Sequence, residues 1–497
     1  MRAMGALIGC MLLAPASALA ADHLVRDPAA YAAAVKKAVP GDRILLADGE
    51  WRDFQIVFTG TGTADKPITL AAQTPGKVIL TGQSNLRIGG AHLVVSGLVF
   101  RNGHSPTKEL IAFRRDSKTV ARDTRLTQIV VDNFTNPDRR AEDIWVAIYG
   151  TGNRVDHSWF AGKGNAGVTL AVIRPKGQGS ENLARIDHNF FGPRPPLGSN
   201  GGETIRIGTS DESLSDSKTV IERNWFEKCD GEVEIVSIKS GGNVIRGNMI
   251  MESQGAIVLR HGNGNLVERN VFLGKGKSST GGIRVINRDQ IVRDNYLEGV
   301  TGTSFLSAIA VMNGVPNSVI NRYHQVANAR IERNSFIEVA RITFGAGADA
   351  ERSAPPIGSW FEHNLIANAD GKDIVRFEGA VTGIALAGNV RQAVKLQRAA
   401  NGLLYPADPA LAGVGAPRDL VPLKRGEAGP AWYPKDVPAA AAGRMIDAPA
   451  KEGALAKAVA ASGAGDTVRV GAGTHPVVQP IPVAHPLTVT GPRGAVV

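Results

Sequence analysis

The chain has 497 residues, too many for one compact hydrophobic core, so we expect an elongated repeat or several domains. Its formal net charge of +10 suits a polyanionic partner. The sequence shows no helix-turn-helix, zinc-finger or stacking-aromatic module, so we expect an acidic polysaccharide rather than nucleic acid. Oligomeric state is left open.

The first 20 residues have the pattern of a secretory signal peptide. Arg2 supplies the positive start, residues 6–14 the apolar centre and residues 18–20 a small-residue site, with cleavage expected after Ala20. A lipoprotein signal ending at Cys10 is the alternative, although its apolar segment would be very short. No later run reaches the roughly 18 apolar residues of a membrane span. We therefore expect a secreted or periplasmic protein without a membrane span.

Residues 29–40 are rich in alanine and predict a short helix, and residues 43–47 predict a strand. Such a helix, placed ahead of many strands, can cap the end of a repeat structure whose backbone edge would otherwise be exposed.

A short phrase recurs from residue 130 onward: an apolar residue, two variable residues and an asparagine, usually followed closely by an aromatic residue. The asparagines of this phrase are Asn133, Asn189, Asn224, Asn248, Asn270, Asn295, Asn334 and Asn364, and Ser158 is a variant. From Asn224 to Asn295 the intervals are 24, 22 and 25 residues. A period of this size, with short β-rich runs, glycine punctuation and no intervening helix, is typical of a solenoid.

The repeat predicts an all-β fold, a parallel β-helix over residues 21–396. Equivalent positions of successive coils would lie about 4.8 Å apart, so each asparagine could hydrogen-bond its equivalents in the coils above and below. We interpret these asparagines as structural. His157, His188 and His363 adjoin the ladder position and are interpreted as turn residues rather than metal ligands.

Charged residues gather in the middle of the repeat. Glu232 and Glu234 alternate with apolar residues, as on one face of a strand. Lys239, Arg260 and Arg284 lie nine, ten and eleven residues before the asparagines of three consecutive coils, so we expect them at nearly the same place on each coil. Like charges on neighbouring strands repel each other unless opposite charges or a ligand offset the repulsion. We therefore interpret these three basic residues as functional.

These residues also carry a resemblance. The segments 200–206, 231–234, 237–240 and 259–263 resemble, in order and spacing, the motifs of polysaccharide lyase family six, which comprises alginate lyases and the dermatan-cleaving chondroitinase B type. The resemblance covers about residues 23–440. It implies a right-handed parallel β-helix that cleaves an anionic polysaccharide, in this interpretation alginate.

The resemblance further implies roles for single residues. Lys239 would be the Brønsted base and Arg260 the acid. Calcium would be the cofactor, and its implied ligands are Asn200, Glu203, Glu232 and Glu234. Arg284 and His261 match positions near the substrate, and Arg206 belongs to the same motif and is expected to bind substrate.

The chemistry can be argued independently of the resemblance. Elimination in a uronate polymer removes the C5 proton, and the resulting dianion is costly while the adjacent carboxylate is ionised. A hard cation with oxygen ligands can neutralise that carboxylate. A neutral lysine is then a competent base, and a neighbouring arginine and calcium favour its neutral form. An arginine stays charged at working pH, so Arg260 can stabilise developing charge while the proton comes from water or another group.

Two further features are interpreted from the residues alone. Arg322 and Tyr323 follow an irregular insertion at residues 300–321 and are expected to line the substrate groove. Cys229 is the only cysteine after the signal peptide, which excludes an intramolecular disulfide, and we interpret it as a small buried residue.

Three alternatives to an alginate lyase differ in the residues they would need. A dermatan sulfate lyase would need more basic subsites for the sulfate groups. A non-catalytic β-helix that binds an acidic polysaccharide would not need the paired glutamates. A glycoside hydrolase would need a carboxylic acid as proton donor opposite a second carboxylate, whereas the central charges here are basic.

The end of the chain repeats its beginning. After a last ladder element near Asn389, residues 397–450 are rich in alanine, proline and glycine and predict an irregular linker or wrap. Residues 455–459 and 465–470 then match residues 31–35 and 41–46 at a constant offset of 424. We therefore expect residues 451–497 to form the start of a second, truncated β-helix.

Overall fold

The computed structural model describes residues 20–177, 179, 181–391, 394–434, 444–463, 466–483, 487–492 and 494–496. The predicted signal peptide lies outside these residues except for Ala20. The chain divides into two compact units, Met1–Trp432 and Tyr433–Val497. None of the helices in the described residues is long and apolar enough to cross a membrane.

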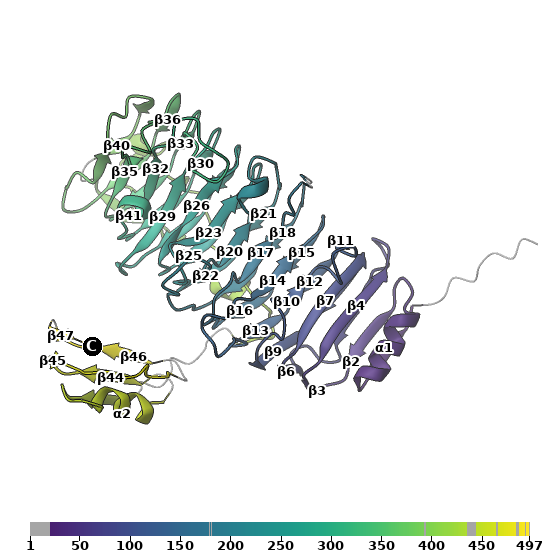
Figure 1. Cartoon of the computed structure of the whole chain (residues 1–497). Coiled ribbons are helices and arrows are strands. Elements are labelled where there is room, and N and C mark those ends of the chain that lie inside the picture. Colours follow the sequence, from purple (N-terminus) through teal and green to yellow (C-terminus); the bar gives the residue numbers. More distant parts are fainter. Residues whose placement is uncertain are drawn as a thin grey trace, which may run out of the picture. The chain divides into compact units, whose positions relative to one another are not determined.

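The first unit is a column of parallel strands (Figure 1). In the described residues its three sheets contain 14, 13 and 13 strands, and each strand pairs in parallel with the equivalent strand of the next coil. Sheet A runs from β1 (Asp22–Val25) to β39 (Ile384–Ala387), and sheet B from β3 (Gly49–Arg52) to β40 (Val390–Arg391). Sheet C includes β4 (Gln55–Thr61) and ends at β38 (Val375–Phe377). The predicted parallel β-helix is confirmed.

One coil shows how the sequence makes the column. It consists of β21 (Val220–Glu222) in sheet A, β22 (Trp225–Glu227) in sheet B and β23 (Glu234–Lys239) in sheet C. The central or alternate residues of these strands are apolar, and Ile221, Phe226, Val236 and Ile238 are at most 1% exposed. Because side chains alternate across a strand, the intervening residues point outward and are free to carry charge.

The predicted N-terminal helix is α1 (Pro28–Lys37). Its start is set by Asp27, whose carboxylate accepts a hydrogen bond from the Ala30 N–H, and by proline in the first turn. Tyr31 is buried against the first coils, and its hydroxyl donates to the Val57 carbonyl. The helix therefore packs on the N-terminal part of the hydrophobic core, as expected of a cap.

The asparagine ladder is present at the turns between sheets A and B. The amide of each ladder asparagine accepts from the backbone N–H of its equivalent one coil earlier, at 2.8–3.0 Å. The members are Asn189, Asn224, Asn248, Asn270, Asn295, Asn334, Asn364 and Asn389, with Ser158 at the start. The residue before the asparagine usually has a positive φ, including His157, His188 and His363, whose assignment as turn residues is confirmed.

The prediction for Asn133 was wrong. Asn133 is exposed and follows β13 (Val130–Asp132), which lies in sheet B beside β16 (Trp159–Ala161). The ladder position of that coil is instead Ile129, whose N–H donates to the Ser158 hydroxyl. Asn133 occupies the following turn, with a φ of 52° that asparagine tolerates. The recurring sequence phrase therefore fits this segment, but its asparagine lies in the turn after sheet B and not in the turn between sheets A and B.

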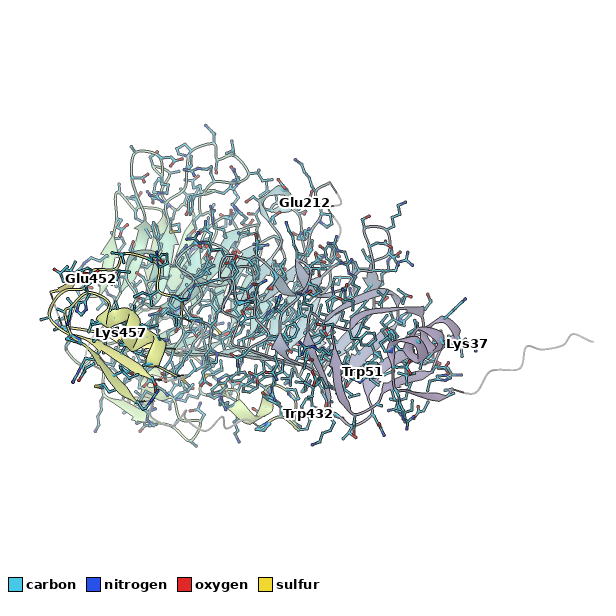
Figure 2. The ribbon with its side chains drawn as sticks, turned by 60° about the horizontal axis from the view of Figure 1, so that its bottom comes forward. Lys37, Trp51, Glu212, Trp432, Glu452 and Lys457 are labelled. Atoms are coloured by element: carbon cyan, nitrogen blue, oxygen red, sulfur yellow. The ribbon has the colours of Figure 1, made fainter. Side chains whose placement is uncertain are left out.

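Residues after 396 run back along the column. The hairpin of β41 (Leu396–Arg398) and β42 (Leu404–Pro406) is followed by irregular chain that contacts successively earlier coils. Arg425 pairs with Glu227, and Trp432 donates to Gln128 at 3.0 Å (Figure 2 labels Trp432). The first part of the predicted segment 397–450 is therefore a wrap on the first unit.

The second unit repeats the topology of the chain's first elements. Strand β43 (Met445–Ala448) precedes α2 (Ala454–Ala461), and β43, β44 (Thr467–Val470) and β46 (Thr488–Thr490) form a parallel sheet. Asp466 accepts from the Arg444 and Gly463 N–H groups, just as Asp42 accepts from Ala21 and Val39. The offset repeat in the sequence thus corresponds to a repeat in structure.

Candidate active site

Most of the predicted site residues converge on the outer face of sheet C. Four consecutive strands carry Arg206, Glu234, Lys239, Arg260 and Arg284: β20 (Ile205–Ile207), β23, β26 (Gly255–His261) and β29 (Thr280–Val285). Asn200, Glu203 and Glu232 precede β20 and β23, and Tyr323 reaches the groove from a loop. The aliphatic neighbours of the charged residues, such as Leu259 and Ile283, belong to the core of the column. The alternation in each strand therefore places the charges together outside the column.

The three basic residues do not form the straight row that their spacing predicts. Arg284 lies opposite Val258, two residues before Arg260. An irregularity between Ile238 and Lys239 places Lys239 opposite His261. The counts of nine, ten and eleven residues to the ladder ignore this irregularity, and a one-residue difference in a strand changes the face on which a side chain lies.

A groove of about 650 Å³ runs between these strands and an overlying loop. It is lined by the predicted residues Asn200, Glu203, Arg206, Glu232, Glu234, Lys239, Arg260, Arg284 and Tyr323, together with Gly201, Val233, Thr303, Ser304, Phe305 and Leu306. A second cavity of about 390 Å³ shares Asn200, Glu232, Val233 and Leu306 with it. The shared residues make one extended depression, which suits a chain-like ligand.

Three glutamates concentrate negative charge on one side of the groove. Glu232 accepts from the N–H groups of Gly201 and Gly202 at 2.8 and 3.0 Å. Burial, together with the charges of Glu203 and Glu234, raises its pKa to about 7 although these hydrogen bonds act in the opposite direction. Glu203 is 4% exposed, and its Oε2 has no hydrogen-bond partner among the described residues. Carboxylates in this state fit a cation that would relieve their charge.

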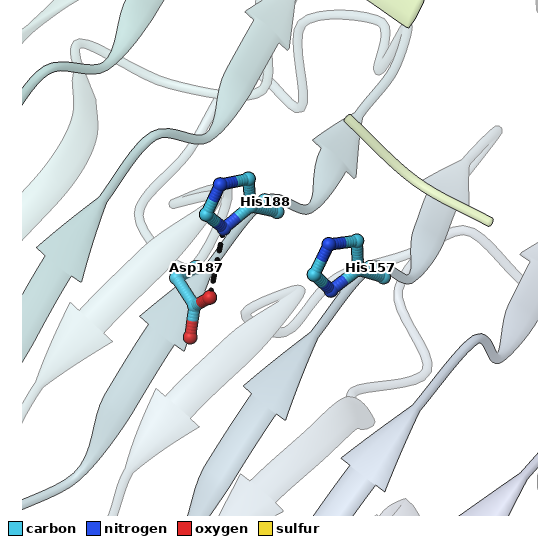
Figure 3. Close-up of side chains that lie close together, drawn as sticks. All are labelled: His157, Asp187 and His188. Carbon is cyan, nitrogen blue, oxygen red and sulfur yellow. Dashed lines mark hydrogen bonds and ion pairs between the residues drawn. The ribbon is translucent and has the colours of Figure 1, made fainter. Parts of the chain in front are cut away.

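Asn200 lies at the exposed edge of this group. The most compact arrangement of potential metal ligands in the described residues is elsewhere, however, and consists of His157, Asp187 and His188 (Figure 3). The oxygens of the three glutamates are therefore less tightly gathered than the atoms of that group, whose ligand atoms lie within 4.8 Å of one another.

The His157, Asp187 and His188 group is already hydrogen-bonded. Both oxygens of Asp187 accept from Arg154, at 2.7 and 2.6 Å, and His188 Nδ1 lies 2.8 Å from the same carboxylate. Arg223 donates to His188 Nε2, and the two imidazoles stack in parallel with centroids 4.8 Å apart. These contacts explain the group as a stack of turn residues held by ion pairs.

Lys239 and Arg260 face the groove with few competing partners. The nearest carboxylate oxygen to Lys239 Nζ is Glu203 Oε1, at 4.0 Å. Arg260 donates to the Arg322 carbonyl at 3.1 Å, and its Cζ lies 4.1 Å from the centre of the Tyr323 ring. No carboxylate of the described chain lies within 4.0 Å of Arg260. The guanidinium is thus oriented but not neutralised.

Arg284 is buried beneath the loop rather than exposed beside Arg260. It is 5% exposed, donates from Nε to the Phe305 carbonyl at 3.0 Å, and lies 3.6 Å from Glu234. Burial lowers its pKa, while the charge of Glu234 acts in the opposite direction. Phe305 was not predicted from the sequence, because its place over the groove depends on a loop of irregular conformation.

Two other predicted substrate residues do not line the groove. His261 is 1% exposed, with Nε2 3.2 Å from the Ser210 hydroxyl, and burial lowers its pKa to about 3. Arg322 directs its side chain to Glu351 and contributes its carbonyl to Arg260. Cys229 is buried as expected, and burial raises its pKa to about 12.

Arg194 is a supporting residue that sequence reasoning missed. It is 3% exposed and donates to the carbonyls of Glu203 and Gly167, at 2.9 and 2.7 Å. It also donates to the Asn165 carbonyl at 3.1 Å. Arg194 thereby fixes the backbone of the segment that carries Asn200 and Glu203. Most of its partners are main-chain carbonyls, which leave no signal in the sequence.

A charged groove along the outer face of a β-helix defines a protein that acts on an extended anionic chain. The sequence profile of the Chondroitinase B family matches residues 25–411. A solved structure of AlyGC, an alginate lyase of polysaccharide lyase family 6, is 50% identical with a TM-score of 0.85, over 95% of this chain and 68% of that chain.

Two further solved structures of similar fold belong to the same family. A mannuronic acid specific family 6 lyase from human gut microbiota is 31% identical with a TM-score of 0.70, over 83% of this chain and 97% of that chain. A family 6 polysaccharide lyase from Pseudopedobacter saltans is 26% identical with a TM-score of 0.70, over 83% and 99% of the two chains. A search of curated proteins gave no match. The chain belongs to polysaccharide lyase family six, and the protein is a polysaccharide lyase.

Proposed function

We propose that this lyase cleaves alginate by β-elimination in the groove on sheet C. The observation that carries the proposal is the convergence in one groove of an amine, an unneutralised guanidinium and three glutamates. The 50% identity to an alginate lyase supports the choice of substrate. The fold supports it too, because a groove across successive coils can hold several sugars of one chain.

Lys239 is the proposed base. Its Nζ takes the C5 proton of a uronate, the C4–O4 bond breaks, and a C4=C5 double bond forms in the sugar that keeps the carboxylate. Arg260 lies beside the reacting sugar and stabilises the negative charge that develops. Arg206 and Arg284 carry further positive charge in the groove, which suits the carboxylates of a polyuronate.

Calcium is the proposed cofactor, held by Glu203, Glu232 and Glu234 with Asn200 at the open edge. The unpartnered Glu203 oxygen and the raised pKa of Glu232 support a cation at this place. When bound, the ion would neutralise the substrate carboxylate next to C5 and so acidify the proton that Lys239 removes. Arg194 would keep the loop of Asn200 and Glu203 in position.

Dermatan sulfate is the second candidate substrate, because the matched family is that of chondroitinase B. The two substrates can be compared directly by ultraviolet absorbance of the unsaturated product, with alginate and dermatan sulfate at equal uronate concentration. We expect a rise with alginate and little or none with dermatan sulfate. The reverse order would overturn the substrate assignment, and no rise with either would overturn β-elimination of these polymers.

We also propose that the protein acts outside the cytoplasm, in the periplasm or the medium. The signal-like first 20 residues and the size of a polymeric substrate support this proposal. N-terminal sequencing of the exported protein should begin at Ala21. Retention of the intact N-terminus in the cytoplasmic fraction would contradict it.

A further inference from the structure

The elimination needs a proton donor for the departing O4, and Arg260 is a poor one. The pKa of a guanidinium lies above about 12, so it keeps its proton at any working pH. Giving that proton to a sugar alkoxide in each turnover is therefore unfavourable. The other titratable groups that line the groove are Glu203, Arg206, Glu232, Glu234, Lys239, Arg284 and Tyr323. Lys239 is occupied as the base, and the glutamates form the cation-binding side.

The two histidines near Arg260 are also unsuitable donors. Neither His261 nor His324 lines the groove. Burial lowers the pKa of both imidazoles, and the charge of Arg260 acts in the same direction. The lowered pKa favours the neutral form of both imidazoles; His261 is 1% exposed, and the Nε2 of His324 is buried. Tyr323 is the remaining side chain of the groove with a proton that can be given and recovered.

Tyr323 is placed to donate. Its ring stacks under the Arg260 guanidinium at 4.1 Å, and the Arg352 guanidinium lies 5.6 Å from the same ring. The loop is fixed at this point because the Tyr323 carbonyl accepts from Val315 at 2.7 Å. Among the described residues the Tyr323 hydroxyl has no hydrogen-bond partner, so its proton is available to a bound sugar.

A second Arg–Tyr pair in the same protein shows what a purely structural pair looks like. Arg114 stacks on Tyr149 at the same distance, 4.1 Å. There the tyrosine hydroxyl donates to Glu109 at 2.5 Å, and the arginine donates to both oxygens of that carboxylate. Glu109 thus neutralises the charge of this arginine and accepts the hydrogen bond of the tyrosine hydroxyl. Around Tyr323 both the guanidinium charge and the hydroxyl are left for a ligand.

We propose that Tyr323 is the catalytic acid of this lyase and that Arg260 is the cation that supports it. This inference rests on the proposed function, with Lys239 as base. As the C4–O4 bond breaks, its electron pair stays on O4, which takes the proton of the Tyr323 hydroxyl. The tyrosinate that forms is stabilised by the guanidinium groups of Arg260 and Arg352. Lys239, now protonated, returns its proton through solvent to Tyr323, and both groups are restored.

The test is a comparison of leaving groups with Tyr323→Phe, which keeps the ring and its stacking on Arg260. One substrate is an alginate oligosaccharide, whose sugar alkoxide leaves only when protonated. The other is a uronate that carries 4-nitrophenol at O4, which leaves as an anion without a donor. We expect kcat to fall about 100-fold or more on the oligosaccharide and to change less than about twofold on the aryl ether.

Two control variants make the result specific. Tyr149→Phe alters the neutralised pair and should leave the ratio of the two rates unchanged. Lys239→Ala should stop both reactions, because both need the C5 proton to be removed. If Tyr323→Phe keeps wild-type kcat on the oligosaccharide, or slows both substrates equally, Tyr323 is not the acid. If Lys239→Ala remains active on both, the proposed function itself fails.

Discussion

The asparagine ladder and the groove are built on the same coils but treat polar groups in opposite ways. In the ladder, the Asn248 carbonyl oxygen accepts from Asn224, and its amide donates to Ile221 and Asn270, all at 2.9–3.0 Å. In the groove, as far as the described residues show, Glu203 has an oxygen without a partner and Arg260 has no carboxylate to neutralise it. The ladder is internally satisfied, whereas the groove is completed by what binds there.

This difference has an energetic consequence. Buried polar groups stabilise a fold only when they are paired, so the ladder should contribute to stability and nothing to turnover. Unpaired charges in the groove cost stability and are kept for binding and chemistry. Substitutions in the two regions should therefore separate activity from stability.

The largest effect is expected for Lys239→Ala. Without the base, kcat should fall by roughly 10³-fold or more, since general-base catalysis contributes on this scale. The melting temperature should stay close to that of the wild type, because the Lys239 Nζ lies 4.0 Å from Glu203 Oε1, too far for a strong ion pair. Initial rates on alginate and a thermal melt of the same preparation measure both quantities. A variant with more than a few per cent of wild-type activity would show that another group is the base.

Asn248→Ala should give the converse result. It leaves buried donors and acceptors of the neighbouring coils unpaired, and we expect the free energy of unfolding to fall by about 2–4 kcal/mol. The kcat should stay near the wild-type value at temperatures where the fold persists. Asn389→Ala, at the last and more accessible rung, is the matched control and should cost less. Equal losses in the two variants would contradict cooperative stacking of the ladder.

Chelation sharpens the comparison at the groove. Excess chelator should lower the activity, and added calcium should restore it. Glu234→Gln removes one charge and should raise the calcium concentration for half-maximal activity roughly tenfold or more. Calcium titrations of wild type and variant provide the measurement. Full activity in excess chelator would assign the glutamates another role, such as orienting Lys239.

The ion pairs at the outer face of sheet A give a smaller, pH-dependent effect. Burial raises the pKa of Asp156, but hydrogen bonds from Arg125 and His157 outweigh burial, and the pKa ends below its usual range. Because the pKa of Asp156 is lower in the folded than in the unfolded protein, its negative charge stabilises the fold at pH values above the unfolded-state pKa of about 4. This stabilisation is lost as the pH falls and the carboxylate becomes protonated. Asp156→Asn should therefore lower the unfolding free energy by about 2 kcal/mol at pH 7.

The Asp156→Asn difference should shrink as the pH is lowered below about 4. Denaturant titrations of both proteins across this range test the sign. A difference that is the same at neutral and acidic pH would exclude the charge of Asp156 as its cause.

Sequence reasoning succeeded where a pattern repeats over short distances. The ladder asparagines from Asn189 to Asn364 can be predicted because each coil contains the same turn with the same short sequence pattern. Asn133 failed because an asparagine also suits the next turn, and only the pairing of β13 with β16 sets the frame. Glu232, Lys239 and Arg260 could be singled out because charged residues interrupt apolar strands at related positions.

The rest of the site depends on contacts that a linear pattern does not contain. Arg194 binds carbonyls of loops up to 29 residues away, and Phe305 reaches the groove through an irregular loop. The irregular strand pairing after Ile238 shifts Lys239 relative to Arg284, and no residue type at this point predicts that irregularity. The open Arg260–Tyr323 pair and the neutralised Arg114–Tyr149 pair differ only in their surroundings, which the sequence does not show.

The smallest effect is expected for removal of the second unit. Residues 433–497 form their own small core, which includes Leu455, Val459 and Val468. Deleting them should leave the melting temperature of the first unit within a few degrees of its value and spare kcat on a trisaccharide. Loss of activity on that short substrate would show that the second unit contributes to the groove.

The central claim is that the groove on sheet C breaks its polymer by elimination at C5. Mass spectrometry of the oligosaccharides released from alginate in ¹⁸O-water tests this claim most directly. We expect every fragment with a new non-reducing end to be unsaturated and lighter by one water molecule than the saturated oligosaccharide, no fragment to carry label introduced by cleavage, and no products from Lys239→Ala. Saturated products that carry one ¹⁸O from cleavage would mean hydrolysis and would contradict the account.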